Sequence, residues 1–158
     1  MTHFDSTGRA RMVDVSEKPV TQRMAKAQGV IRMKRETLEA IRSGATRKGD
    51  VIAVARIAGI MAAKRTAELI PLCHPIPLTD VDLTIELEDD LPGARVTASA
   101  KTAAQTGVEM EAIVAATVTL LTIFDMVKGI DRGLTIGEVT VTEKLGGKSG
   151  HWVRDLHL

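Results

Sequence analysis

Residues 81–100 constrain the fold more than any other part of the chain. Val81 to Leu87 alternates apolar with polar residues, and Val96 to Ala100 repeats the alternation after the sequence Asp89-Asp90-Leu91-Pro92-Gly93. A period of two is typical of strands that bury one face, and Asp, Pro and Gly favour tight turns. We therefore expect a β-hairpin with one face on a hydrophobic core.

The remaining elements are expected on both sides of this hairpin. Alternation predicts strands over residues 25–33 and 134–142, and the helical spacing of apolar residues predicts helices over 34–43, 50–69 and 108–128. Asp50 is expected to cap the second helix, since its carboxylate can accept hydrogen bonds from first-turn N–H groups. Residues 70–78 contain three prolines and predict a stiff extended loop.

This order of elements is the split β-α-β pattern of the ferredoxin-like fold. We therefore predict an α+β protein in which a four-stranded antiparallel sheet carries its helices on one face. The 158 residues fit a single domain, which we place over residues 11–158, after a polar and mobile N-terminal segment, 1–10. Residues 143–150 are expected to form a glycine-rich basic loop, followed by a short tail.

Composition disfavours several functions. The chain has two Phe, one Trp and no Tyr, so it lacks the aromatic residues on which single-strand nucleic-acid binders stack bases. Its net charge of +1 is too small for a protein held on DNA or on a membrane by bulk charge. The longest uncharged apolar stretch, Ala112 to Phe124, is shorter than the ~20 residues that span a bilayer. With no apolar signal core at its start, the chain is expected to be cytoplasmic.

Metal and redox chemistry find little support in the sequence. Cys73 is the single cysteine, so no disulfide or CxxC pair is predicted. The four histidines lack ligand spacing, and we predict no metal site and no required cofactor. An Mg²⁺ ion that enters with substrate phosphates stays open as an alternative.

Asp125 and Lys128 are the first candidates for chemistry. They stand three residues apart on the predicted helix 108–128 and therefore share a face. Glu111 precedes Asp125 by fourteen residues, an angular offset of ~40° at ~100° per residue, so one side of the helix would carry all three. The alternative is a surface ion pair worth under ~1 kcal/mol. That alternative is weakened because the pair ends a helix with few other charges.

Three further groups could bind anions. His74 lies in the proline-rich loop and changes charge near neutral pH, although a histidine packed in a turn is the alternative. Lys144 and Lys148 lie among glycines whose N–H groups can approach a phosphate, although a flexible terminus would also be glycine-rich. Lys48, at the start of the second helix, could meet an anion or be solvated.

These segments occur in the same order in one known family. The matching segments are Met12–Ser16, Lys48–Val51, Ala55–Ile60, Ala63–Thr66, Leu69–Pro75, Thr106–Ala112, Asp125–Met126 with Lys128, and Gly146–Gly150. The chain thus resembles cyclic pyranopterin monophosphate synthase, the molybdenum cofactor biosynthesis protein C family, from about residue 12 to residue 150. Pro-Leu-Cys-His-Pro and Thr-Gly-Val-Glu-Met-Glu-Ala are the most specific shared motifs.

The resemblance implies a phosphorus-oxygen lyase of molybdenum cofactor biosynthesis. Such an enzyme converts 3′,8-cyclo-7,8-dihydroguanosine triphosphate into cyclic pyranopterin monophosphate and pyrophosphate. The resemblance also implies a homohexamer, a trimer of dimers, with active sites between subunits. By match, Asp125 and Lys128 are the catalytic pair, with Lys48 beside them. The matched substrate-binding residues are Leu72, Cys73, His74, Met110, Glu111, Arg23, Lys64, Lys144 and Lys148.

Two positions depart from the family pattern, and two other functions stay open. Gln105 stands where a basic residue is expected in relatives, and Leu145 stands where a small serine is common. Our hypothesis makes Lys128 and Lys48 general acid and base, oriented by Asp125, a role typically worth ~10²–10⁴ in rate. A nucleotide-sensing module would bind a purine triphosphate without releasing pyrophosphate. An RNA-binding ferredoxin-like domain would need aromatic residues that the predicted strands lack.

Overall fold

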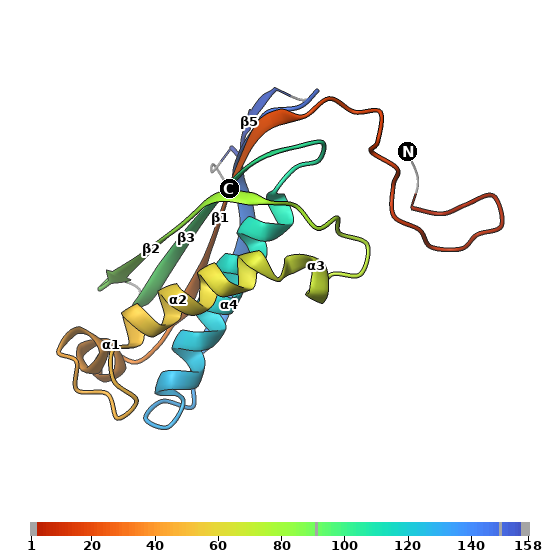
Figure 1. The fold of residues 1–158 in the computed structure, drawn as a ribbon. Coiled ribbons are helices and arrows are strands. Elements are labelled where there is room, and N and C mark those ends of the chain that lie inside the picture. The colour runs from red at the N-terminus through yellow and green to blue at the C-terminus, as the bar shows by residue number, and fades with distance from the viewer. Residues whose placement is uncertain (1–2, 91, 149, 156–158) are drawn as a thin grey trace.

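The protein forms a five-stranded antiparallel sheet with its long helices packed on one face (Figure 1). The computed structural model describes residues 3–90, 92–148 and 150–155. The strands are β1 (Thr21–Arg32), β2 (Leu78–Glu88), β3 (Gly93–Ala104), β4 (Thr135–Leu145) and β5 (His151–Val153). The helices are α1 (Arg35–Arg42), α2 (Val51–Lys64), α3 (Thr66–Leu69) and α4 (Glu109–Val127). This α+β, ferredoxin-like architecture confirms the predicted fold class.

The sheet has the strand order β2-β3-β1-β4-β5. β2 and β3 form the predicted hairpin, in which Ile85 lies opposite Val96. β1 occupies the centre and pairs with β3 on one side and β4 on the other. Alternate β3 residues such as Val96, Ala98 and Ala100 are buried beneath the helices, as a period of two requires.

The sheet has one strand more than the four that the sequence predicted. β4 continues through residues 143–145, which we had assigned to a loop, and β5 pairs with these three residues. Gly146, Gly147 and Gly150 have φ values between 63° and 102° and reverse the chain between the two strands. β5 was missed because its three residues are exposed, and the end of β4 was missed because Glu143 and Lys144 are charged; neither segment shows an apolar alternation.

The predicted helix 50–69 is two helices in the structure. Asp50 caps the first as expected, since its side chain accepts a hydrogen bond from Ala53 N at 3.0 Å. α2 then ends at Lys64, and Arg65 leaves helical geometry with φ −111° and ψ 13°. The short α3 follows and leads into the proline-rich loop.

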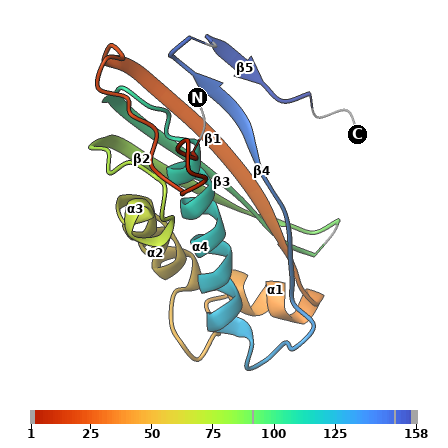
Figure 2. The same cartoon turned by 90° about the vertical axis from the view of Figure 1, so that its right-hand side faces the viewer.

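α2 packs directly against α4 (Figure 2). Gly59 of α2 lies in this contact. A Cβ atom at Gly59 would lie 2.1 Å from Thr119 Oγ1 and 3.0 Å from the Ala115 carbonyl oxygen. The helix backbones can therefore come this close only without a side chain at residue 59. The two helices run in opposite directions, so the start of α2 lies near the end of α4.

α4 is the central helix of the core. Ala112, Ala116, Leu120 and Ile123 are fully buried against the sheet and α2. By length and composition alone α4 could cross a membrane, but 56% of its apolar window is buried inside the protein. The core helix of a soluble protein passes the same test, so α4 is weak support for a membrane span.

The chain before β1 extends beyond the body of the protein in Figure 1. Phe4 and Ala10 form an isolated antiparallel bridge, and the Asp5 side chain accepts backbone hydrogen bonds from Thr7 and Arg9. Residues 1 and 2 lie outside the described residues. The mobility expected of segment 1–10 stays a prediction.

Candidate active site

The first cluster lies where α4 ends. Each carboxylate oxygen of Asp125 accepts a hydrogen bond from one lysine. Lys128 Nζ lies 2.7 Å from Oδ1, and Lys48 Nζ lies 2.7 Å from Oδ2. Lys48 also donates to the backbone carbonyl oxygen of Asp125 at 2.9 Å. Lys48 comes from the loop before α2, so the antiparallel packing of α2 and α4 brings together residues that are distant in sequence.

Electrostatics keep the Asp125 carboxylate ionised. The hydrogen bond from Lys128, then that from Lys48, lowers the pKa of Asp125 to about 2. All three side chains are roughly half exposed, so the pairs contribute little to folding stability. A fixed anion that holds two ammonium groups in place is nevertheless a suitable orienting group for proton transfer.

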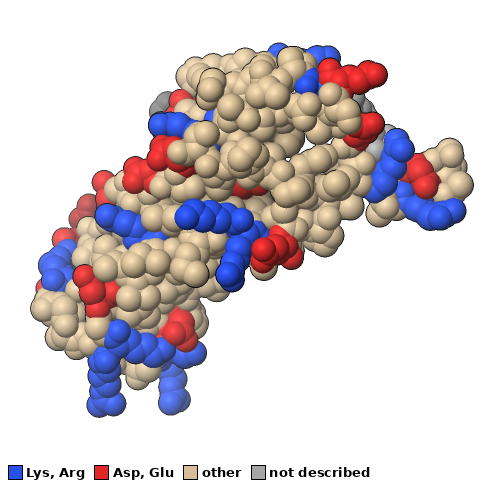
Figure 3. All heavy atoms as spheres, in the orientation of Figure 1, with Lys and Arg blue, Asp and Glu red and all other residues tan. Residues whose placement is uncertain are grey.

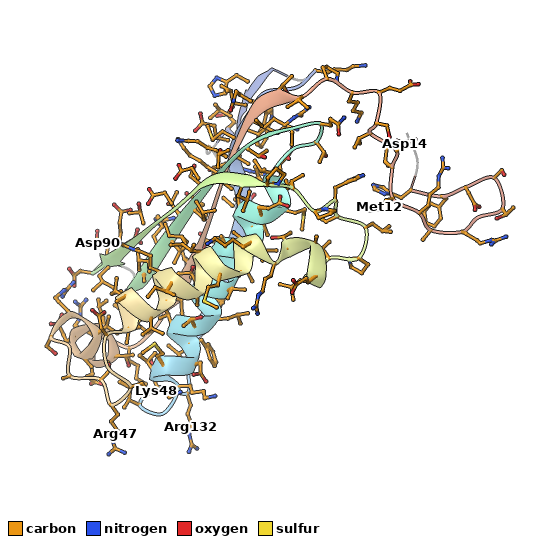
Figure 4. All side chains as sticks on the ribbon, in the orientation of Figure 1. Met12, Asp14, Arg47, Lys48, Asp90 and Arg132 are labelled. Atoms are coloured by element: carbon orange, nitrogen blue, oxygen red, sulfur yellow. The ribbon has the colours of Figure 1, made fainter. Side chains whose placement is uncertain are left out.

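These residues line a hollow of about 290 Å³. Arg47, which the sequence analysis did not single out, lines it as well. Figure 4 shows Lys48 at this end of the molecule, with Arg47 and Arg132 projecting beyond it. Figure 3 shows acidic and basic side chains mixed over the visible face, so basic character is local rather than general.

A second cluster surrounds the opposite end of α4. Leu72, Cys73 and His74 from the proline-rich loop meet Met110 and Glu111 from the first turn of α4 in a cavity of about 380 Å³. Four of the five lie between buried and exposed, and Glu111 is buried. The five predicted residues therefore line one cavity, and their role in binding substrate stays a prediction.

His74 also fastens the N-terminal segment to this cavity. Its Nε2 atom donates to the Val13 carbonyl oxygen at 2.7 Å. Val13 and Val15 consequently line the cavity beside the proline-rich loop. The histidine therefore makes a structural hydrogen bond through one ring nitrogen, as the alternative interpretation expected. Its ring also lines the cavity.

Burial disfavours charge in this cavity. Glu111 is only 4% exposed, and burial raises the pKa of its carboxyl group. Burial, and then the nearby Glu111, raises the pKa of the Cys73 thiol. A protonated thiol and a carboxyl group that readily holds a proton suit hydrogen bonding to a neutral heterocycle.

A third region adjoins the second. Arg23 and Lys148 line a cavity of about 560 Å³, together with Gln105, Gly147 and five neighbouring residues. The Arg23 guanidinium donates to the backbone carbonyls of Ala104 and Gln105 at 3.1 and 3.2 Å. A Cβ atom at Gly147 would lie 2.3 Å from Arg23 Nη1, and its φ of 71° favours glycine, so the loop packs on this arginine without a side chain between them.

Lys144 and Lys64, which were also predicted to bind phosphate, do not line this cavity as Lys148 does. Lys144 forms an ion pair with Glu109 at 3.2 Å, so a phosphate would have to compete with that carboxylate. Lys64 is exposed in the last turn of α2 and lines neither of the two neighbouring cavities among the described residues. Neither lysine is therefore preformed for contact with a phosphate in this structure.

The structure does not bring all the predicted residues together within one subunit. Glu111 and Asp125 are fourteen residues apart on α4, which separates them by ~21 Å at 1.5 Å per residue. Glu111 is also buried, whereas Asp125 is exposed. Our interpretation that one side of the helix carries Glu111, Asp125 and Lys128 as a group was therefore incomplete, because it ignored position along the axis.

The fold and the clusters together define a class of protein. It is a ferredoxin-like α+β protein with lysine and carboxylate groups suited to proton transfer, and it has a basic cavity suited to a small anionic ligand. Comparison with known proteins narrows this to one family. The model described as the MoaC family matches residues 12–147, and the chain belongs to that family.

Its relatives are similar over nearly their whole length. The chain is 59% identical over 152 residues to the cyclic pyranopterin monophosphate synthase of Brucella ovis, covering 96% of this chain and 92% of the relative. The identity and coverage are the same for the enzyme of that name from Brucella abortus (strain 2308). It is 53% identical over 155 residues to the one from Thermomicrobium roseum, covering 98% and 93%. The resemblance drawn from the motifs is confirmed.

Proposed function

We propose that this protein is a cyclic pyranopterin monophosphate synthase. It converts 3′,8-cyclo-7,8-dihydroguanosine triphosphate into cyclic pyranopterin monophosphate and pyrophosphate during molybdenum cofactor biosynthesis. The observation that carries the proposal is the Lys48–Asp125–Lys128 cluster, with both lysines 2.7 Å from one carboxylate, in a chain 59% identical to enzymes of that name.

We infer that a complete active site contains residues from two subunits of a homohexamer. The ~21 Å between Glu111 and Asp125 along α4 supports this, because a single nucleotide cannot contact both ends. The outer face of α2 offers a surface for association, since Val54, Ile57 and Met61 are 44%, 58% and 50% exposed. The hexamer is a trimer of dimers in this proposal.

The reaction requires proton transfers and one phosphoryl transfer. A sugar hydroxyl attacks the α-phosphorus, the bond to the β-phosphate oxygen breaks, and pyrophosphate leaves with the electron pair. Lys128 and Lys48 act as general acid and base, and the lysine that accepts a proton must be neutral at that step. Asp125 orients both lysine side chains through its two carboxylate oxygens.

The remaining clusters bind the substrate in this proposal. The cavity around Cys73, His74, Met110 and Glu111 holds the purine-derived base. Arg23, Lys64, Lys144 and Lys148 hold the phosphates and stabilise charge on the departing pyrophosphate. No resident cofactor is needed for these steps, and any Mg²⁺ enters with the phosphates. We place the activity in the cytoplasm.

The test is an anaerobic incubation of the purified protein with 3′,8-cyclo-7,8-dihydroguanosine triphosphate. We expect pyrophosphate and the fluorescence of the oxidised pterin product to appear in equal amounts. Binding without either signal would instead support a nucleotide-sensing module and overturn the proposal.

A further inference from the structure

Asp131 is a buried acidic residue that the proposed mechanism does not use. It lies in the α4–β4 connection, residues 128–134, and is only 1% exposed. Its Oδ2 atom accepts hydrogen bonds from the Lys34 N–H at 2.8 Å and from the Thr37 hydroxyl at 3.1 Å. Its Oδ1 atom accepts one from the Gly133 N–H at 2.8 Å. A buried carboxylate is costly unless donors of this kind satisfy it.

These hydrogen bonds keep the buried group ionised. Burial by itself would raise the pKa of Asp131, but the hydrogen bonds from Lys34, Gly133 and Thr37 outweigh burial and lower that pKa. The side chain is therefore a fixed anion inside the protein, with each oxygen committed to a named donor.

Two of the three donors belong to the start of α1. Lys34 precedes α1 and provides no capping hydrogen bond from its own side chain, and Thr37 is buried in the first turn. Asp131, which is distant in sequence, supplies the acceptor for these donors, and a carboxylate also suits the positive end of the helix dipole. The start of α1 is thus fastened to the α4–β4 connection.

The same connection begins with a residue of the acid–base cluster. Lys128 N–H donates to the Phe124 carbonyl oxygen at 2.9 Å, and Asp131 N–H donates to the Val127 carbonyl oxygen at 3.1 Å. The backbone from Lys128 to Asp131 is therefore hydrogen-bonded to the last turn of α4. Asp131 follows Lys128 by three residues and Asp125 by six.

The loop that carries Lys48 joins α1 to α2. Gly44 and Gly49 of this loop have φ values of 70° and 89°, and Gly44 N–H donates to the Ile41 carbonyl oxygen at 3.2 Å, which ties the loop to the end of α1. The far end of the loop is fixed because α2 packs on α4. The near end is fixed through α1, whose start Asp131 holds.

We propose that Asp131 is a positioning residue, which fixes where Lys48 meets Asp125 by holding the start of α1 on the α4–β4 connection. This inference rests on the proposed function, because it gives Lys48 a part in proton transfer. Asp131 acts through Lys48 and does not itself contact the substrate. Such support matters for rate, since a misplacement of ~1 Å can cost ~10² in turnover.

The first experiment measures pyrophosphate release by Asp131→Asn. We expect kcat to fall roughly tenfold to hundredfold with KM unchanged, because proton transfer depends on the exact position of Lys48. In a Lys48→Ala background the same change should cost almost nothing more, since two changes that act through one group are not additive. General damage to the fold would instead lower both rates by the same factor.

A second pair of variants breaks the contact without changing Asp131, and it decides the question even where Asp131→Asn does not fold. Lys34→Pro removes the N–H that Asp131 accepts, and the φ of −67° at Lys34 suits proline. Lys34→Ala is the matched control, because it removes the same side chain and keeps the N–H. We expect Lys34→Pro to lower kcat severalfold and Lys34→Ala to keep nearly all activity.

Three outcomes would overturn the inference. They are a Lys34→Pro variant that behaves like Lys34→Ala, a loss that appears in KM with kcat unchanged, and a loss from Asp131→Asn that is equally large in the Lys48→Ala background. An unmodified protein that releases no pyrophosphate would overturn the proposed function instead.

Discussion

The two ends of α4 carry opposite kinds of site. At its end, Asp125 and two lysines form exposed ion pairs in a shallow hollow. At its start, Glu111 is buried beside a thiol, in surroundings that disfavour charge. One helix can thus present exposed charged groups for proton transfer at one end and a half-buried cavity for recognition at the other. The comparison teaches that the predicted proton-transfer and recognition residues lie at opposite ends of one helix, about 21 Å apart within a single chain.

The largest effect is expected from removing the charged end. Asp125→Ala or Lys128→Ala should lower kcat by ~10²–10⁴, the usual contribution of a positioned acid or base. Because the ion pairs are exposed, the melting temperature should change little. Lys101→Ala is the control, since it breaks another exposed pair, with Asp80 at 3.1 Å, on the sheet. Pyrophosphate release near that of the control would remove Asp125 or Lys128 from the mechanism.

Mixing two inactive variants tests whether the ends belong to one active site. Asp125→Ala lacks one end and His74→Ala lacks the other. If subunits share sites, random reassembly of the two variants should restore roughly a quarter of the unmodified activity, because that share of sites receives both intact halves. The measurement is pyrophosphate release after joint unfolding and refolding. Activity no higher than that of either variant alone would mean that each subunit works separately.

The close packing of α2 on α4 can be weakened without changing a residue of either cluster. Gly59→Ala places a Cβ atom 2.1 Å from Thr119 Oγ1, so overpacking should cost ~1–3 kcal/mol in the free energy of unfolding. Gly129→Ala has no atom within 4 Å of the new Cβ and should cost much less. Denaturant unfolding of both variants provides the measurement. Equal midpoints would show that α2 and α4 are less tightly packed than their geometry indicates.

The smallest expected effect is a pH-dependent change in stability caused by Glu111, which is buried at the start of α4. The raised pKa of Glu111 means that the folded state favours the protonated carboxyl group. Glu111 therefore stabilises the fold most below its unfolded pKa of about 4.5, and this contribution is lost as the pH rises through the folded value. Glu111→Gln should raise the melting temperature at pH 7 while lowering activity, and the gain should vanish in acid.

Glu36→Gln is the control for this effect, because Glu36 is an exposed acid in the first turn of α1. It removes the same charge from a helix start without releasing a buried group. If Glu111→Gln and Glu36→Gln changed the melting temperature alike at all pH values, burial of Glu111 would have no energetic consequence.

Local patterns were sufficient for most elements. The alternation in 81–87 and 96–100, the turn between them and the capping residue Asp50 all act over a few residues, and the structure confirms each. The extension of β4 pairs with β1 on one side and β5 on the other, whereas β5 lies at the edge of the sheet. Both escaped prediction because their residues are partly or fully exposed on both faces and show no apolar alternation. The interruption at Arg65 likewise left no signal in the helical periodicity.

The residues of the candidate site likewise divide into those that the sequence could predict and those that only the structure revealed. Residue type and motif were enough to select Asp125, Lys128 and His74, since proton transfer and anion binding need those groups. Asp131 and Arg47 gave no such signal, because an acid or an arginine in a loop is usually solvated, and only the structure shows that the first is buried and the second lines a hollow. Their selection required knowing what surrounds each side chain.

The sequence by itself determined the fold class and the family and selected the candidate acid–base residues, because periodicity, turn chemistry and motif order are properties of the chain alone. Only the tertiary structure decided where those residues lie. Antiparallel packing of α2 on α4, made possible by Gly59, carries Lys48 to Asp125. The rise of α4 places Glu111 ~21 Å from that pair. Distances of this kind depend on how separate elements pack, which no local pattern records.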